Sequence, residues 1–65
     1  MEDYEIVASI NNLKRKYPKM LVKQVGAYIV IAANYQDLES KARKVNRGYT
    51  DGFYTIEQAL REKVV

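Results

Sequence analysis

Apolar and β-branched residues are concentrated in one stretch, which runs from Lys19 to Ala33 and reads KMLVKQVGAYIVIAA. Its residues alternate between two faces, and Gly26 stands where a tight turn between two strands would fall. The pattern therefore predicts a β-hairpin over about 19–33, whose second strand runs from Ala27 to Ala33. Both faces of this second strand are apolar, which is typical of a strand that is covered on both sides or paired at an oligomer interface. The sequence leaves both explanations open.

Residues 3–17 fit two patterns. As a strand, the segment DYEIVA would alternate weakly ahead of a short helix. As one helix, the segment has apolar residues at i, i+4, i+7 and i+11, which are Ile6, Ile10, Leu13 and Tyr17. The first turn is acidic, the last turn is basic, and a proline follows, and each feature favours a helix that ends before the proline. We therefore predict a helix over 3–17.

A second helix is predicted over about 35–47. Asn34 can begin it, and Gly48 suits the left-handed residue just past its end. Its apolar stripe consists of Leu38, Ala42 and Val45, with Tyr35 as a further candidate.

The remaining residues predict a turn followed by a third helix. Asp51 and Gly52 stand between aromatic pairs, which indicates either a short hairpin or a single strand. Thr55 and Gln58 have the spacing of a capping box, so a helix is expected over about 55–63. Its inward residues are predicted to be Ile56, Ala59, Leu60 and Val64.

These elements predict a single α+β domain over residues 1–65. A small antiparallel sheet is built on the central β-hairpin (about 19–33) and is packed by two to three amphipathic helices (about 3–17, 35–47 and 55–63). We expect the helices on one face of the sheet. A chain of 65 residues without cysteine or histidine can form neither disulfides nor thiolate zinc sites. Helix packing or self-association must then supply the stability that so small a core lacks, so a homo-oligomer is expected, in its simplest form a homodimer.

The charge of the chain permits several partners and requires none. Eleven basic residues against eight acidic residues give a net charge of +3, which tolerates a nucleic acid or an acidic protein. No apolar run is long enough to span a membrane, and the acidic start MEDYE differs from the basic start of a signal peptide. The expected location is cytoplasmic, with no membrane partner.

Catalytic chemistry is not expected. The two serines, Ser9 and Ser40, fall within helix patterns, and we expect both to face solvent without an activating base. The carboxylates near the helix starts are explained by the helix dipole, and the three glycines form no phosphate-binding loop. The sequence therefore predicts no enzyme, no catalytic residue, no metal site and no cofactor.

Two kinds of surface residue remain. Tyrosine on an exposed turn is a common anchor of protein interfaces, which suggests a protein-interaction site at Tyr49, Phe53, Tyr54 and Tyr28. The alternative is that the rings at 49, 53 and 54 pack over the ends of the sheet. Basic side chains could instead follow phosphates, and the residues expected in a nucleic-acid site are Lys14, Arg15, Lys16, Lys41, Lys44 and Arg47.

The function expected from these surfaces is that of a small non-enzymatic binding or regulatory protein. It would act through contacts with another protein, as an inhibitor or accessory factor of phage-like type. The alternative is a nucleic-acid-binding accessory protein that uses the basic helix faces.

Overall fold

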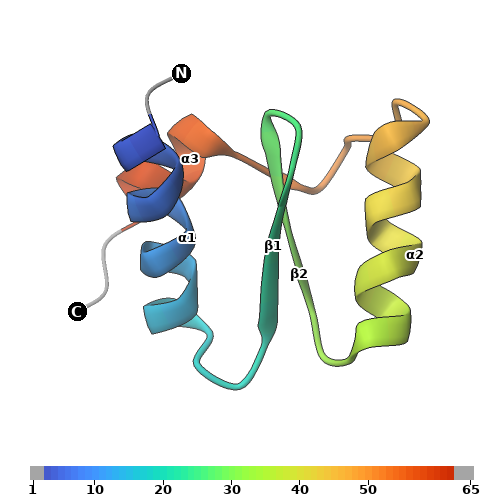
Figure 1. Ribbon diagram of the computed structural model, residues 1–65, viewed down its shortest axis with the longest axis horizontal. Helices are drawn as coiled ribbons and strands as arrows, with labels where there is room; N and C mark the ends of the chain where they lie inside the picture. Colours follow the sequence, from blue (N-terminus) through green and yellow to red (C-terminus); the bar gives the residue numbers. More distant parts are fainter. Residues whose placement is uncertain (1–2, 63–65) are drawn as a thin grey trace.

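The computed structural model describes residues 3–62, and it confirms the predicted α+β fold (Figure 1). Three helices and a three-stranded antiparallel sheet follow one another as α1 (Asp3–Lys16), β1 (Leu21–Val25), β2 (Tyr28–Ala32), α2 (Tyr35–Asn46), β3 (Tyr54–Thr55) and α3 (Ile56–Arg61). The predicted end of the last helix at residue 63 and the predicted inward position of Val64 lie outside the described residues.

Helix α1 settles the choice between strand and helix for residues 3–17. Its first turn carries acidic residues and its last turn basic residues, as the dipole favours. Leu13 is fully buried. The expectation that Ser9 faces solvent is wrong: Ser9 is also fully buried, and its hydroxyl donates a hydrogen bond to the carbonyl of Ile6 at 2.7 Å. This bond back to the preceding turn satisfies the hydroxyl without water. Ser40, in α2, is half-buried rather than exposed.

The central hairpin turns at Gly26, as predicted. Gly26 has a φ of 60°, and no residue other than glycine has a positive φ within the described chain. A positive φ at the first of two turn residues is the pattern of a type II′ turn, which matches the twist of the flanking strands. The register runs without interruption from Val25 opposite Tyr28 to Leu21 opposite Ala32.

The helices cover both faces of the sheet, so the prediction that they lie on one face is wrong. Figure 1 shows α1 and α3 together on one side of the hairpin and α2 on the other. The reason is the composition of β2. Its Ile29 packs into a cluster with residues of α1 and α3, while Val30 and Ala32 point the other way and pack under α2. The sequence left two explanations for the two apolar faces of β2, and the structure supports coverage by helices on both sides.

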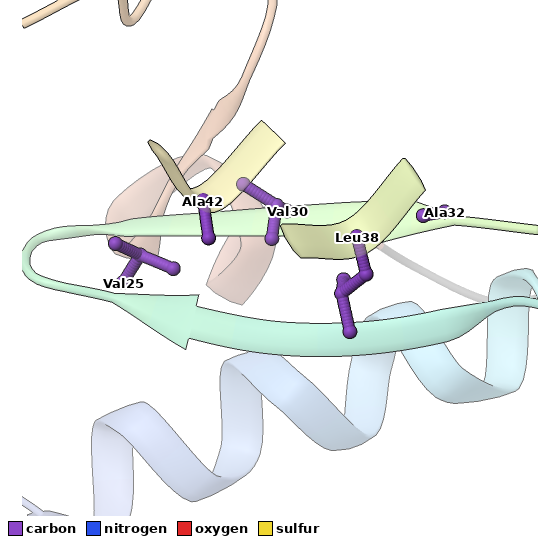
Figure 2. Packing of buried hydrophobic residues seen from close by; sticks show 5 residues of the cluster. All are labelled: Val25, Val30, Ala32, Leu38 and Ala42. Carbon is purple, nitrogen blue, oxygen red and sulfur yellow. The ribbon is translucent and has the colours of Figure 1, made fainter. Parts of the chain in front are cut away.

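Figure 2 shows the cluster beneath α2, in which the helix lies over the two long strands. Its buried members come from all three elements: Val25, Val30, Ala32, Leu38 and Ala42. The cluster on the other face has Leu13, Ile29, Ile56 and Ala59 as its buried members.

The ends of α2 have the predicted chemistry. The side chain of Asn34 accepts a hydrogen bond from the backbone N–H of Asp37 at 2.8 Å. At the other end, Gly48 has a φ of 90°, and Tyr49 donates to the carbonyl of Lys44 at 2.9 Å, which is a Schellman arrangement. Tyr35 is 74% exposed and does not join the apolar stripe.

The turn at Asp51 and Gly52 forms, but no hairpin surrounds it. Tyr49 and Thr50 are not in a strand, and only Tyr54 and Thr55 join the sheet, beside β2. The sequence predicted either a short hairpin or a single strand here, and the single strand is correct. Thr55 and Gln58 then form the predicted capping box, with hydrogen bonds in both directions.

Candidate protein-interaction site

Two adjoining hollows open at the surface beside β3, and both are lined by Gly52, Phe53 and Tyr54. The first has a volume of about 260 Å³ and is also lined by Gln58. The second has a volume of about 200 Å³ and is also lined by Ile29, Ile31 and Lys41. We call the two together the β3 hollow.

The β3 hollow exists because the pairing between β2 and β3 stops early. Ile29 pairs with Tyr54, so two residues further along β2 the next partner of Ile31 would be Gly52. Gly52 instead has a φ of 86° and belongs to a turn in which Phe53 donates to the carbonyl of Thr50 at 3.3 Å. The turn carries the chain away from the sheet, and the position beside Ile31 is left without a strand from residues 3–62.

A lysine side chain covers the main chain at this open position. Lys41 Nζ donates to the carbonyl oxygen of Ile31 at 2.8 Å and lies 3.2 Å from Asp37 Oδ2. A carbonyl with no strand beside it still needs a donor, and the ammonium group supplies one. The β3 hollow therefore carries a positive charge, which a half-exposed carboxylate partly offsets.

The structure brings together two of the four aromatic residues predicted for protein interaction. Phe53 and Tyr54 line the β3 hollow, and both are half-buried. Neighbours in an extended segment point to opposite faces, and accordingly Phe53 packs against the cluster beneath α2 while Tyr54 packs against the cluster beneath α1 and α3. Two predicted residues lie outside the lining: Tyr49, which is 68% exposed, and Tyr28, which is half-buried on β2.

The hydroxyl of Tyr54 is held by a second tyrosine. Its oxygen lies 3.2 Å from the hydroxyl oxygen of Tyr17, just after α1. This hydrogen bond, together with burial, raises the pKa of Tyr54 above its ordinary value. The bond anchors β3 to the end of α1, so one wall of the β3 hollow is fixed by a contact between segments far apart in the sequence.

The six basic residues predicted for nucleic-acid binding do not share one surface. Three lie at the end of α1, two lie on α2, and Arg47 directly follows α2 as its C-cap; the two helices cover opposite faces of the sheet (Figure 1). Two of the six are already engaged within the chain, because Lys16 pairs with Glu62 at 2.6 Å and Lys41 caps Ile31. The other four are exposed: Lys14, Arg15, Lys44 and Arg47.

Four residues that line the β3 hollow were not predicted as site residues: Ile29, Ile31, Gly52 and Gln58. The sequence places Ile29 and Ile31 only in the strand, Gly52 only in the turn and Gln58 only in the capping box. The spacing of Thr55 and Gln58 shows the cap but not the cavity beside it, since the position of the cavity depends on the register between β2 and β3.

Residues 3–62 contain neither a cluster of metal-ligating side chains nor a helix that could span a membrane. No group of three or more acidic, histidine or cysteine side chains is placed to hold a metal ion. None of the helices in this range combines the length and the apolar character needed to cross a membrane.

Three comparisons with known proteins complete the description. The chain matches no family model, no curated protein and no solved structure.

Proposed function

We propose that this chain is a small non-enzymatic binding protein that regulates another protein by contact, and that the β3 hollow is the contact site. The observation that carries the proposal is the open main-chain position at Ile31, which lies beside two aromatic side chains and a lysine. An open position at a sheet edge is suited to an added strand, and flanking pockets then select its side chains.

The partner segment that fits this site is extended and acidic. Lys41 is the charged residue in the lining of the β3 hollow. An ammonium group has three N–H donors, and its contacts with Ile31 and Asp37 account for two of them. A carboxylate of the partner can take the third donor, while an apolar side chain of the partner packs against Phe53 or Tyr54. The role of inhibitor or accessory factor, and the cytoplasm as the compartment, belong to the same proposal.

A selection from a library of random peptides tests this function. The purified chain is the bait, and the selected peptides are measured against wild type, Lys41→Gln and Lys44→Gln. Lys44 is exposed on the same helix but does not line the β3 hollow, so it is the matched control. We expect selected peptides rich in Asp and Glu, whose affinity falls about tenfold or more in Lys41→Gln, as for the loss of a charge-assisted hydrogen bond, and is unchanged in Lys44→Gln.

Chemical shifts of the labelled chain locate the peptide. Binding at the β3 hollow is expected to move the amide signals of Ile31, Phe53 and Gln58. Peptides without acidic residues, or peptides that bind both variants equally and leave these signals in place, would refute the proposal.

Nucleic-acid binding is the second candidate, and it has less support. Four of the predicted residues are exposed, but they are divided between the helices on opposite faces of the sheet, which does not favour contact with one rigid duplex. Anisotropy of labelled RNA and DNA at low salt tests the idea. Binding that weakens steeply with salt and is lost in Lys44→Glu together with Arg47→Glu would favour this second function over the first.

A further inference from the structure

The outer side of β1 is an open pairing edge at the opposite side of the sheet from the β3 hollow. The strand order is β1-β2-β3, and no other strand within residues 3–62 lies beyond β1. Ile56 donates to the carbonyl of Ala27, so the main chain of Ala27 is directed toward β3. Main-chain groups point to alternate sides along a strand, so those of Tyr28, Val30 and Ala32 form their hydrogen bonds with β1.

The same alternation identifies the outward groups of β1. Leu21, Lys23 and Val25 pair with the β2 residues that face them and use their main-chain groups there. Val22 and Gln24 consequently direct their N–H and C=O groups away from the sheet. Edge strands are usually protected by proline, a bulge or charge, and this one has five continuous pairs, no proline and a single charged side chain, Lys23.

We propose that a second copy of this chain pairs with this edge, β1 against β1, to form a six-stranded sheet across a two-fold axis. The lysine restricts the register. A register with Lys23 opposite its own copy sets like charges against each other, which is unfavourable. Registers with Val22 or Gln24 opposite its own copy place Lys23 beside Leu21 or Val25 instead, and both use the outward main-chain groups.

The charge of α1 explains why the occupant is a second copy. Helix α1 packs beneath β1 and runs in the opposite direction (Figure 1). A two-fold axis perpendicular to the sheet places the two α1 helices antiparallel on the same face. The acidic first turn, at Asp3, then lies near the basic last turn of the copy, at Lys14. The edge is therefore complementary to itself in charge and in helix dipole.

An exposed apolar residue lies on the appropriate side of α1. Asn12 and Lys16 face α3, because Asn12 donates to the carbonyl of Ala59 at 3.0 Å and Lys16 pairs with Glu62. Val7 lies nine residues before Lys16, which at about 3.6 residues per turn is the opposite side of the helix. Val7 is 56% exposed. It faces away from α3 and toward the position that the second α1 helix would occupy.

This inference does not depend on the proposed function, since the β3 hollow stays open in the pair. Its first test is sedimentation over a range of concentrations. Wild type is expected to pass from the mass of one chain, 7.5 kDa, to that of two. Gln24→Pro removes an outward N–H without removing a bond to β2, and it should raise the dissociation constant about tenfold or more. Gln24→Ala keeps the N–H and should dimerise like wild type.

A charge exchange tests the arrangement even if Gln24→Pro fails to fold. One variant carries Lys14→Glu, and the other carries Asp3→Lys, since both residues lie on the same side of α1 as Val7. Each alone sets like charges against each other in the pair and should stay monomeric, while an equal mixture should restore a dimer that contains one chain of each. A wild type that is monomeric at every concentration, variants that dimerise alone as wild type does, or a mixture that stays monomeric would overturn the inference.

Discussion

The hydroxyl oxygens of Tyr17 and Tyr54 lie 3.2 Å apart, and this single contact joins the end of α1 to the short strand β3. Both rings pack against the same buried cluster. Beside them, the ammonium group of Lys16 bonds to Glu62, and this bond raises the pKa of Lys16. The Tyr17–Tyr54 contact thus ties β3 to the end of α1, and the Lys16–Glu62 contact ties the end of α3 to the same place.

Replacement of Tyr17 by phenylalanine should release Tyr54. The hydrogen bond between Tyr54 and Tyr17 is the largest cause of the raised pKa of Tyr54, so Tyr17→Phe should return that pKa toward its usual value of about 10. The free energy of unfolding should fall by about 1 kcal/mol. Alkaline titration of phenolate absorbance and urea unfolding measure the two effects. Tyr35→Phe, at an exposed position, is the control and should change neither.

Stability should decline at alkaline pH. The pKa values of Tyr54 and Lys16 are both higher in the folded chain, so as the pH rises the unfolded chain loses these protons first and unfolding is favoured. The stabilisation is complete below about pH 10 and disappears as the pH passes through the raised values. Urea unfolding at a series of pH values should show a shallower alkaline decline in Tyr17→Phe and in Glu62→Gln. An identical decline in all three proteins would contradict this account.

Asn12 should be a stabilising link between α1 and α3. Its amide group donates to the carbonyl oxygens of Ala59 at 3.0 Å and Leu60 at 3.3 Å, both near the end of α3. Asn12→Ala leaves these carbonyls without that donor and should cost about 1–3 kcal/mol. Hydrogen exchange of the α3 amides should accelerate along with the fall in stability. Asn11→Ala changes an exposed neighbour and should have little effect.

Both faces of β2 should respond to loss of volume. Ile29 and Val30 are each fully buried, but in different clusters. Ile29→Val should cost about 0.5–1.5 kcal/mol, and Val30→Ala, which removes more, should cost about 1–3 kcal/mol. Thermal unfolding measures both. Tyr4→Ala, at a 70% exposed position, should be close to neutral. If only one face responded, the two-sided packing would be wrong.

Gly26 should tolerate a D-residue better than an L-residue. Its φ of 60° is unfavourable for L-alanine by about 1–2 kcal/mol, although a Cβ would meet no atom within 4 Å there. D-alanine prefers positive φ, so the chemically synthesised chain with D-alanine at position 26 should be at least as stable as the native chain. A comparison of melting temperatures decides the matter. Equal losses with both alanines would show that the backbone angle is not the cause.

Local signals in the sequence predicted most of the secondary structure. The capping box at Thr55, the cap at Asn34 and the turn at Gly26 each depend on neighbouring residues only, and all three are confirmed. The prediction that all helices lie on one face of the sheet was wrong, because the face that each helix covers depends on contacts between residues far apart in the sequence. The expectation that Ser9 faces solvent was wrong for a related reason, since burial of a hydroxyl depends on the elements that pack around it.

The β3 hollow was predicted only in part. The aromatic turn suggested Phe53 and Tyr54, and both line it. The open position beside Ile31 could not be predicted, because it follows from the two-residue length of β3 and from its register against β2. Neither quantity is encoded in a pattern of neighbouring residues. The involvement of these side chains in protein contacts stays a prediction.

The central place of β2 has a consequence for how the molecule melts and how it can be shortened. Its alternate residues belong to both clusters, so neither layer has a core of its own once this strand leaves the sheet. The chain should therefore lose its structure in one step, with no half-folded species between. Removal of α1 or α2 from a recombinant version would uncover a whole apolar side and yield an aggregating fragment rather than a smaller stable unit.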